Sequence, residues 1–449
     1  MGRSSTTRRG PLPRPDVRAD DATLTRFAGV LPFVRFCHAL DLPALLKVVV
    51  PGRGRRRLHA AHHVLFAFVV SAVLGAQRLA HLDWYEGDAL LLKLVRLSSW
   101  PVRKVFSAAL AAIDDAGVAA LLNIITNLGL RSIHGAHSAV LDFDSTAVVS
   151  FGQQEGALFG YCGKGRNRRR HHPLVASVAE GRTAVHARYR DGSAIDEEEA
   201  IGFFADTVAR VRSRMPGIEI SIRADAGFWS ARVCRWFLGQ GIPFACSLPL
   251  QAGVKLLLWK ATFTPVDEVD DDIETATITG PQLGMDARVK VIVIRRAVHD
   301  KKAPPPGKVV QQDVDGRYQA IVTSLDWAPV DVWRFYNDRG DAERVFKVGK
   351  HALGLANLVS QDFRANEVAF LLRLLAYNAD TLFQADAERT AAEGKRPVLR
   401  MGLLARQPRL YHLAGRLLRV HDRWTLRIPD SRLVARLWAF YDPGGIRVA

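Results

Sequence analysis

Three acidic residues occur in sequence surroundings that are unusual for a carboxylate. Asp144 lies inside the apolar run "SAVLDFDSTAVVS" (138–150). Asp225 lies where the strand-like part of "IEISIRADAG" (218–227) ends, and Glu343 lies in "FYNDRGDAERVFKVGK" (335–350). Clustered carboxylates raise one another's pKa, and a divalent cation removes this cost. Oxygen ligands alone favour Mg²⁺ or Mn²⁺ over zinc. Two such ions about 3.5–4 Å apart can support phosphodiester hydrolysis.

The late stretch around Glu343 has a second feature, a line of polar residues. On a helix that turns 100° per residue, the polar side chains share a stripe roughly 60° wide; they are Tyr336, Arg339, Glu343 and Lys350. One interpretation is a solvated face on which Arg339 and Glu343 form an i, i+4 pair, worth about 0.2–0.5 kcal/mol. The other is a face that binds something.

The elements that must position these residues follow from periodicity. Strands are predicted at 138–150, 172–180, 182–190, 218–227 and 242–250, with helices at 196–215 and 229–241. The order β-β-β-α-β-α-β predicts an α/β fold with a ribonuclease-H-like mixed sheet. In that layout the first and fourth strands are neighbours, and a late helix at 331–353 crosses their ends. The three carboxylates would then meet, although Asp142 points to the same side of its strand as Asp144 and competes for that role.

Five regions are predicted along the chain. We expect a flexible basic tail at 1–22 and a helical domain at 23–135, which is suited to DNA binding of the helix-turn-helix type. The catalytic core would comprise 136–250 and 326–390, interrupted by an inserted β-rich subdomain at 251–325. Residues 391–449 form a C-terminal region with a predicted hairpin at 415–429 and a helix near 431–441. The stretch 102–130 is expected to be two helices that break near Gly117.

Composition limits the class of partner. Sixty-two Lys and Arg against 45 Asp and Glu leave a net charge of +17, which favours a polyanion, most commonly nucleic acid. The four cysteines are widely spaced and predict neither a zinc motif nor a disulfide framework, as suits a reducing cytoplasm. The longest apolar run, 64–76, is shorter than the roughly 18 residues of a membrane span. We therefore expect a buried helix there and no membrane association.

A second basic cluster follows Asp144 in the sequence. It contains Lys164, Arg166, Arg168, Arg169 and Arg170, with Gly163 and Gly165 beside the lysine. A solvated surface loop and a mobile loop that grips phosphates next to the active site both fit this pattern. We expect Lys164, Arg168, Arg169 and Arg170 to bind DNA. His171 and His172 come next, but adjacent positions are poorly placed to share one metal ion.

The chain resembles a large group of bacterial insertion-sequence transposases that use an Asp-Asp-Glu triad. Tyr336, Arg339, Glu343 and Lys350 match the spacing Y-x2-R-x3-E-x6-K of that group. "DST" at 144–146 is similar to its first-acid motif and "ADAGF" at 224–228 to its second. The resemblance implies a ribonuclease-H-like core with a β insertion. It also selects Asp144 over Asp142, and it implies that Asp144, Asp225 and Glu343 are catalytic ligands of two divalent ions, Mg²⁺ or Mn²⁺. Tyr336, Arg339 and Lys350 would contact DNA near the scissile phosphate.

The predicted function is therefore cut-and-paste DNA transposition of an insertion sequence. The expected partners are double-stranded DNA, both element ends and target, and a second copy of the chain when assembled on DNA. A bacterial cytoplasmic, nucleoid-associated location follows from the resemblance. Two alternatives stay open: a metal-dependent nuclease or resolvase of the same fold, and a catalytically inactive DNA-binding protein derived from a mobile element.

Overall fold

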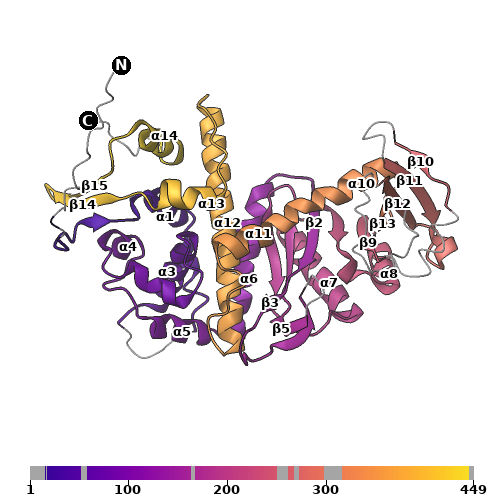
Figure 1. The fold of residues 1–449 in the computed structure, drawn as a ribbon, viewed down its shortest axis with the longest axis horizontal. Helices are drawn as coiled ribbons and strands as arrows, with labels where there is room; N and C mark the ends of the chain where they lie inside the picture. Colours follow the sequence, from indigo (N-terminus) through magenta and orange to yellow (C-terminus); the bar gives the residue numbers. More distant parts are fainter. Residues whose placement is uncertain are drawn as a thin grey trace, which may run out of the picture.

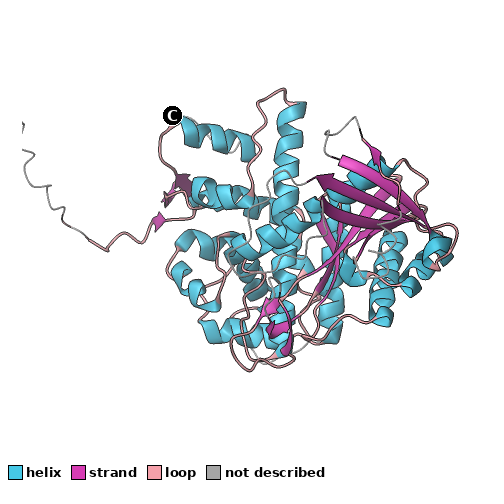
Figure 2. Ribbon diagram, turned by 45° about the vertical axis from the view of Figure 1, so that its right-hand side comes forward, coloured by secondary structure: helices cyan, strands magenta, loops and turns pink. Residues whose placement is uncertain are grey.

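A computed structural model describes residues 16, 18–51, 58–162, 167–249, 261–266, 273–297 and 316–443. The chain is a mixed α/β protein with one large sheet and many helices (Figures 1 and 2). The long helix α12 (Phe363–Glu393) stands between a helical lobe and the sheet and packs against both (Figure 1).

The helical lobe is built mainly from the N-terminal third of the chain. Its α-helices are α1 (Leu31–Ala39), α2 (Leu42–Leu45), α3 (Ala61–Val73), α4 (Ala89–Leu94), α5 (Arg103–Ala111) and α6 (Asp115–Leu130). The expected buried helix is confirmed as α3, in which Val64 to Val73 are all buried. The two helices expected over 102–130 are confirmed as α5 and α6. The break between them lies at 112–114 rather than at Gly117, because Asp114 caps α6 by accepting a hydrogen bond from the Gly117 amide.

Helix α6 is the one described helix that is long and apolar enough, by length and composition, to cross a membrane. Just over half of its apolar window, 56%, is buried inside the fold, where α6 packs against α12 and the outer strand of the sheet. A core helix passes the same test, and packing on both sides accounts for its apolar composition.

The central sheet has nine strands in the order β10-β11-β12-β13-β9-β8-β2-β6-β7. Strand β8 runs parallel to β2 and to β9, and the other pairs are antiparallel. The bounds are β2 (Ser138–Ser145), β6 (Leu174–Val178), β7 (Thr183–Arg188), β8 (Glu219–Ala224), β9 (Phe244–Leu248), β10 (Thr264–Pro265), β11 (Ile273–Thr279), β12 (Lys290–Ala297) and β13 (Gly316–Thr323). The strands of the segment expected to be an insertion thus continue the central sheet through the β13–β9 pair.

Alternation along β2 explains how the sheet is covered. Ala139, Leu141 and Phe143 are buried, and the Phe143 ring lies 4.4 Å from that of Phe204 in helix α7 (Glu197–Arg214). Helix α8 (Ala231–Gly239) contributes Phe237 to the same apolar cluster. Asp142 and Asp144 therefore point to the opposite side of the strand, where the late helices lie.

The late helical segment is not one helix. It comprises α10 (Pro329–Asn337), the short 3₁₀ helix η6 (Asp338–Asp341) and α11 (Ala342–Ala352). The expected continuous helix at 331–353 is therefore wrong, because a 3₁₀ turn advances by 120° rather than 100° per residue. Helix α11 packs against β2 and α12, and α10 packs against β9 and β11 to β13.

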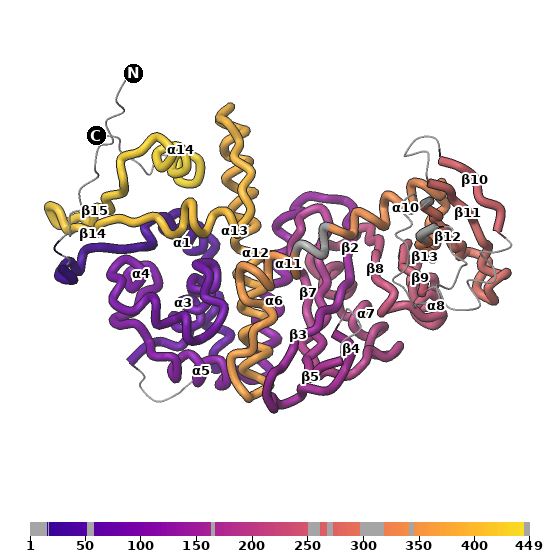
Figure 3. Tube along the Cα trace, viewed as in Figure 1, coloured from indigo at the N-terminus to yellow at the C-terminus, as the bar shows by residue number. Residues whose placement is uncertain are grey.

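Smaller elements complete the chain. A three-stranded sheet contains β3 (Val148–Val149), β4 (Leu158–Tyr161) and β5 (Asn167–His171). A second one joins β1 (Leu24–Thr25) to the hairpin of β14 (Gly415–Val420) and β15 (Arg423–Arg427), so that C-terminal residues lie beside N-terminal ones (Figure 3). Helices α13 (Leu403–Arg406) and α14 (Arg432–Tyr441) lie on either side of this hairpin in the sequence. The predicted hairpin and final helix are confirmed.

Candidate active site

Asp144 lies at the end of β2, next to the last residue of the strand. Its position is set by antiparallel pairing, in which Asp144 is opposite Val175 and Ser145 is opposite Leu174 of β6. Its Oδ1 accepts a hydrogen bond of 2.8 Å from the Ser145 amide, and only 13% of the side chain is exposed. The carboxylate is therefore held at one edge of the sheet.

Asp225 follows directly after β8, the strand that is parallel to β2. Phe143 pairs with Ala224, so Asp144 and Asp225 are the next residues along two adjacent parallel strands. Asp225 caps a short 3₁₀ helix, Ala226–Phe228, by accepting a 2.9 Å hydrogen bond from the Gly227 amide. Burial raises the pKa of Asp225, while the positive charge of Arg339 and hydrogen bonds from the Gly227 and Phe228 amides oppose the rise. Neighbouring parallel strands thus bring the two predicted carboxylates to one place.

Arg339 joins these two carboxylates. Its Nη2 lies 3.2 Å from Oδ1 of Asp144 and 3.8 Å from Oδ2 of Asp225. Only 8% of Arg339 is exposed, so it does not lie on the solvated face of the simpler interpretation, which is wrong. Its buried Nε has no hydrogen-bond partner among the described residues. One guanidinium therefore compensates both negative charges in this conformation.

Asp142, the competitor of Asp144, has a different set of contacts. Arg223 of β8 donates to its two oxygens, from Nε at 2.6 Å and from Nη2 at 2.8 Å. A third nitrogen, Nη1 of Arg223, donates to the Phe335 carbonyl at the end of α10 at 2.6 Å. The Asp142 side chain is fully buried. Both of its oxygens are thus committed to a buried ion pair, whereas Asp144 faces the shared guanidinium.

Of the other three residues of the predicted polar stripe, the two with described side chains differ in how far they are buried and in what they contact. Glu343 lies in the first turn of α11, the helix that packs against β2, and its side chain is outside the part of the chain that the structure describes. Lys350 is half-buried on α11; burial lowers its pKa, and the nearby Asp144 carboxylate opposes that shift. Tyr336 is only 7% exposed and packs among apolar side chains of β9, β12 and β13, which leaves it little free surface for DNA in this conformation.

The basic cluster after Asp144 is largely a strand. Lys164 lies outside the described residues, whereas Arg168, Arg169 and Arg170 belong to β5. The guanidinium groups of Arg168 and Arg169 are exposed, near the rings of Phe151 and Phe159. Arg170 is 7% exposed, and its Nη1 donates to the Tyr161 carbonyl. In this conformation Arg170 is therefore held by the Tyr161 carbonyl of the paired strand β4 and is not a mobile surface side chain, and its DNA-binding role stays a prediction.

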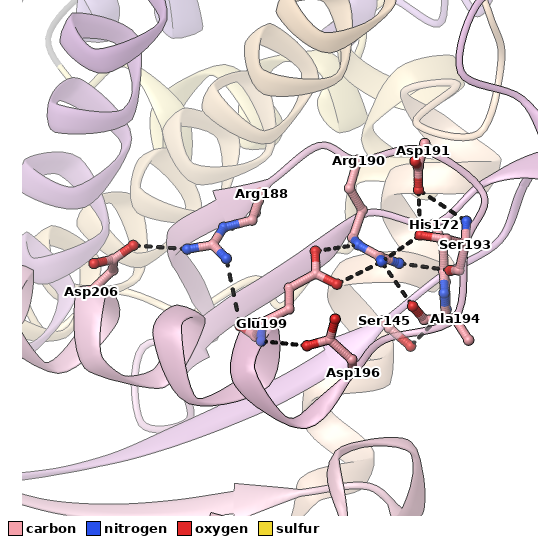
Figure 4. A network of polar contacts seen from close by, with 10 residues as sticks. All are labelled: Ser145, His172, Arg188, Arg190, Asp191, Ser193, Ala194, Asp196, Glu199 and Asp206. Atoms are coloured by element: carbon pink, nitrogen blue, oxygen red, sulfur yellow. Dashed lines mark hydrogen bonds and ion pairs between the residues drawn. The ribbon is translucent and has the colours of Figure 1, made fainter.

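A polar network supports the end of β2 (Figure 4). His172 Nε2 lies 3.1 Å from the Ser145 hydroxyl, and the His172 amide donates to the Asp191 carbonyl at 3.0 Å. Arg190 donates to both oxygens of Glu199 at 2.6 Å and to the Ser193 carbonyl at 2.8 Å. Burial lowers the pKa of His172 to about 4, so the imidazole is neutral at pH 7 and can accept a hydrogen bond from the Ser145 hydroxyl.

Sequence reasoning missed Arg223, Arg190 and His172. Arg223 had a usable signal: it stands in a strand two residues before Asp225, and parallel pairing places it opposite Asp142. A charged residue inside a buried strand requires a partner, because an unpaired buried charge is costly. Arg190 and His172 had no comparable signal. The partners of Arg190 lie in the loop that follows it and at the start of α7, and the His172 side chain contacts Ser145 of β2.

The carboxylate oxygens at this site are of the kind that bind a divalent metal ion. Asp144 and Asp225 offer oxygen ligands from two rigid strand ends, and both already contact one cation. A hard divalent cation prefers carboxylate oxygens, so the chemistry of these ligands fits Mg²⁺ or Mn²⁺. No group of three or more potential ligands assembles among the described side chains, which do not include that of Glu343.

Comparisons with known proteins agree with the sequence motifs. The family model described as "Transposase DDE domain group 1" matches residues 16–439. No curated protein matches the chain significantly. Among solved structures, a piggyBac transposase synaptic complex with hairpin DNA, studied by cryo-EM, is similar with 11% sequence identity and a TM-score of 0.48, over 85% of this chain and 79% of that one. At that level of similarity no residue or role is transferred from it.

Proposed function

The chain belongs to the family of transposase DDE domains of group 1, and from that premise we propose that it cuts and joins DNA at a site formed by Asp144, Asp225 and Glu343. The observation that carries the proposal is the shared guanidinium between Asp144 and Asp225. Two carboxylates from adjacent strand ends that meet at one guanidinium offer the oxygen ligands that a divalent cation prefers. The strand order β9-β8-β2-β6-β7 supports a ribonuclease-H-like core.

Asp144, Asp225 and Glu343 would hold two divalent ions, Mg²⁺ or Mn²⁺. Such ions, when bound, supply activation of the attacking oxygen and stabilisation of the leaving oxygen of a phosphodiester. The protein supplies rigid placement, because strand pairing orients Asp144 and a backbone cap orients Asp225. His172 and Arg190 are positioning residues, since they brace Ser145 and the loop beneath it without reaching the carboxylates.

Arg339 would exchange one anionic partner for another. With a divalent ion held by Asp144 and Asp225, Arg339 would lose these two oxygens as partners, and its guanidinium would be available to a phosphate. Arginine can bind a phosphate through two parallel hydrogen bonds. Lys350, half-buried near Asp144, would add a second positive charge. The substrate would be double-stranded DNA, with the ends of an insertion sequence cut first and then joined to target DNA by a homodimer.

The test uses a supercoiled plasmid that carries the gene with its natural flanking DNA. Wild type with Mg²⁺ should cut at short inverted repeats around the reading frame and yield joined strand-transfer products. Asp144→Asn, Asp225→Asn and Glu343→Gln should each abolish cutting while DNA binding persists. Asp331→Asn is the matched control, because its side chain is 55% exposed on α10. Cutting without joining would indicate a nuclease or resolvase, and binding without any cutting would indicate an inactive DNA-binding protein.

A further inference from the structure

The hairpin β14–β15 is a two-stranded ribbon at one end of the molecule. Its strands are joined by His421 and Asp422, which both have positive φ, 46° and 59°. Such a turn matches the twist of a tight hairpin. Only two residues of β14 pair with β1, and β15 is the outer strand. Figure 1 shows the ribbon at the opposite end from β10 to β13.

Positive charges crowd this ribbon. Arg416 lies directly opposite Arg427, so the two side chains share one face, and Arg423 lies on that face opposite Val420. Like charges directly opposite each other destabilise a strand pair. Arg416 has Asp21 at 2.9 Å, but Arg423 and Arg427 form no ion pair within the described part of the chain. The stability of the isolated protein does not explain this arrangement.

The other face of the ribbon carries an exposed aromatic ring. Trp424 is 54% exposed and lies opposite Arg419, and the Lys93 ammonium lies 3.6 Å from the centre of its ring. The surrounding sequence has the same character. Residues 396–443 contain ten arginines, no lysine and three aspartates, a net charge of +7 out of the +17 of the whole chain.

We propose that the hairpin β14–β15 binds duplex DNA, with Arg423 and Arg427 contacting backbone phosphates. A two-stranded ribbon fits the major groove of B-DNA, and the anionic backbone supplies the partners that the facing arginines lack. The proposal rests on the proposed function, because DNA is the substrate of that activity. It gives a role to the C-terminal region at a distance from the catalytic carboxylates.

The competing explanation is that the arginines protect an exposed strand edge from pairing with other chains. The two explanations differ in salt dependence. Each neutralised phosphate contributes about −0.9 to the slope of log K against log salt. Arg423→Gln/Arg427→Gln should therefore make the slope about 1.8 less steep and weaken binding at low salt.

The experiment measures fluorescence anisotropy of a labelled duplex from the flanking DNA across a KCl series. The control variant, Arg232→Gln/Arg235→Gln, removes the same charge from exposed positions on α8 and should leave the slope unchanged. If both variants make the salt slope less steep by the same amount, the effect comes from net charge alone, and the proposal is overturned. Aggregation of the hairpin variant with an unchanged slope would do the same and favour edge protection.

A second measurement uses the unmodified protein, so it does not depend on how a variant folds. Photo-crosslinking to a duplex containing 5-iododeoxyuridine should attach DNA to a peptide within 415–427. Crosslinks only elsewhere would overturn the proposal even if the plasmid is cut and joined. If the wild type neither binds nor cuts DNA, the proposed function itself fails, which is a separate outcome.

Discussion

At the scale of single residues, Arg339 is the most informative side chain. Its guanidinium lies between two carboxylates from different strands and is almost fully buried. Bringing two carboxylates together raises their pKa values unless a cation compensates them. Arg339 therefore stabilises the fold without metal and competes with any divalent ion for the same oxygens. Its role in folding requires contact with the carboxylates, whereas its proposed role in DNA cutting requires contact with a phosphate.

This competition can be measured with Arg339→Gln. Without metal, the variant should unfold at a lower temperature than wild type, because two carboxylates lose their cation, a loss of about 1–3 kcal/mol. Added Mn²⁺ should raise its melting temperature more than it raises that of wild type. Single-turnover cutting should fall tens- to several-hundredfold, as expected for a loss of about 2–4 kcal/mol in the transition state.

Arg339→Lys provides the comparison within the same position. It retains the charge without the planar fork, so it should recover most of the stability and part of the cutting rate. Melting scans with and without Mn²⁺, alongside the rate measurements, separate the two effects. Equal melting temperatures, metal responses and rates in wild type and Arg339→Gln would show that the contact has no function.

At the scale of elements, the end of α10 is fixed to the sheet by a buried ion pair. Arg223 of β8 bridges Asp142 of β2 and the Phe335 carbonyl, which is three residues before the start of η6. The sheet and the late helices are thus held together close to Arg339. Because the carboxylate and guanidinium are both buried, removing one leaves an uncompensated charge.

Arg223→Met should accordingly lower the free energy of unfolding by about 3–5 kcal/mol. The double variant Asp142→Leu/Arg223→Met should recover most of the loss, since neither charge remains. Arg188→Met is the control, because its partner Asp206 is 59% exposed, and it should cost less than about 1 kcal/mol. Urea denaturation of the four proteins measures these values. A loss below 1 kcal/mol for Arg223→Met would mean that water reaches the pair.

The contact between β7 and α7 predicts a dependence on pH. His186 is 3% exposed and lies 2.8 Å from the Thr207 hydroxyl, which itself donates to the Phe203 carbonyl. Burial lowers the pKa of His186 to about 3. The folded protein therefore holds His186 neutral, while the unfolded chain takes up a proton below pH 6.5. The stability is fully present above pH 6.5 and is lost as the pH falls toward 3.

His186→Phe should remove this part of the acid sensitivity. The new ring keeps the stacking position against Phe203, and Thr207 retains its own acceptor. Between pH 7 and pH 4.5, wild type should lose about 2–3 kcal/mol more than the variant. Chemical denaturation at both pH values gives the difference. Parallel pH profiles would show that His186 is protonated in the folded state or reached by water.

At the scale of the whole molecule, α12 connects the two lobes. Asn378 of α12 exchanges hydrogen bonds with Ala184 of β7, accepting from its amide at 2.8 Å and donating to its carbonyl at 2.7 Å. The same side chain donates to the Ile125 carbonyl of α6. The helical lobe, the sheet edge and α12 therefore share one polar contact, which fixes the sheet that carries the carboxylates relative to the helical lobe.

The net charge of +17 predicts strongly salt-dependent DNA binding. If six to ten phosphates are neutralised, affinity should fall by about 10³–10⁵ between 50 mM and 200 mM salt. A binding series with a duplex from the flanking DNA measures this slope. The same series with a shuffled duplex gives the part that is independent of sequence. A nearly flat dependence would contradict a polyanionic partner.

Several conclusions depended on the sequence alone, because they rest on local periodicity and motif order. The five strands predicted between 138 and 250, the two helices between them and the final hairpin are confirmed, whereas the short strands β3, β4 and β5 were not expected. The family resemblance is confirmed by a match across nearly the whole chain. Alternation along β2 already placed Asp142 and Asp144 on one side of the strand. The assignment of Asp144, Asp225 and Glu343 as catalytic residues stays a prediction.

Only the tertiary structure decided between residues that the sequence left equivalent. Asp142 and Asp144 have the same local pattern, but parallel pairing of β8 with β2 places Arg223 against Asp142 and leaves Asp144 to Arg339. The break of the late helix at η6 and the burial of Tyr336 and Arg170 are likewise invisible in a helical wheel or a charge count. The physical reason is that the cost of a charge depends on the partners and the solvent that contacts across the chain leave to it.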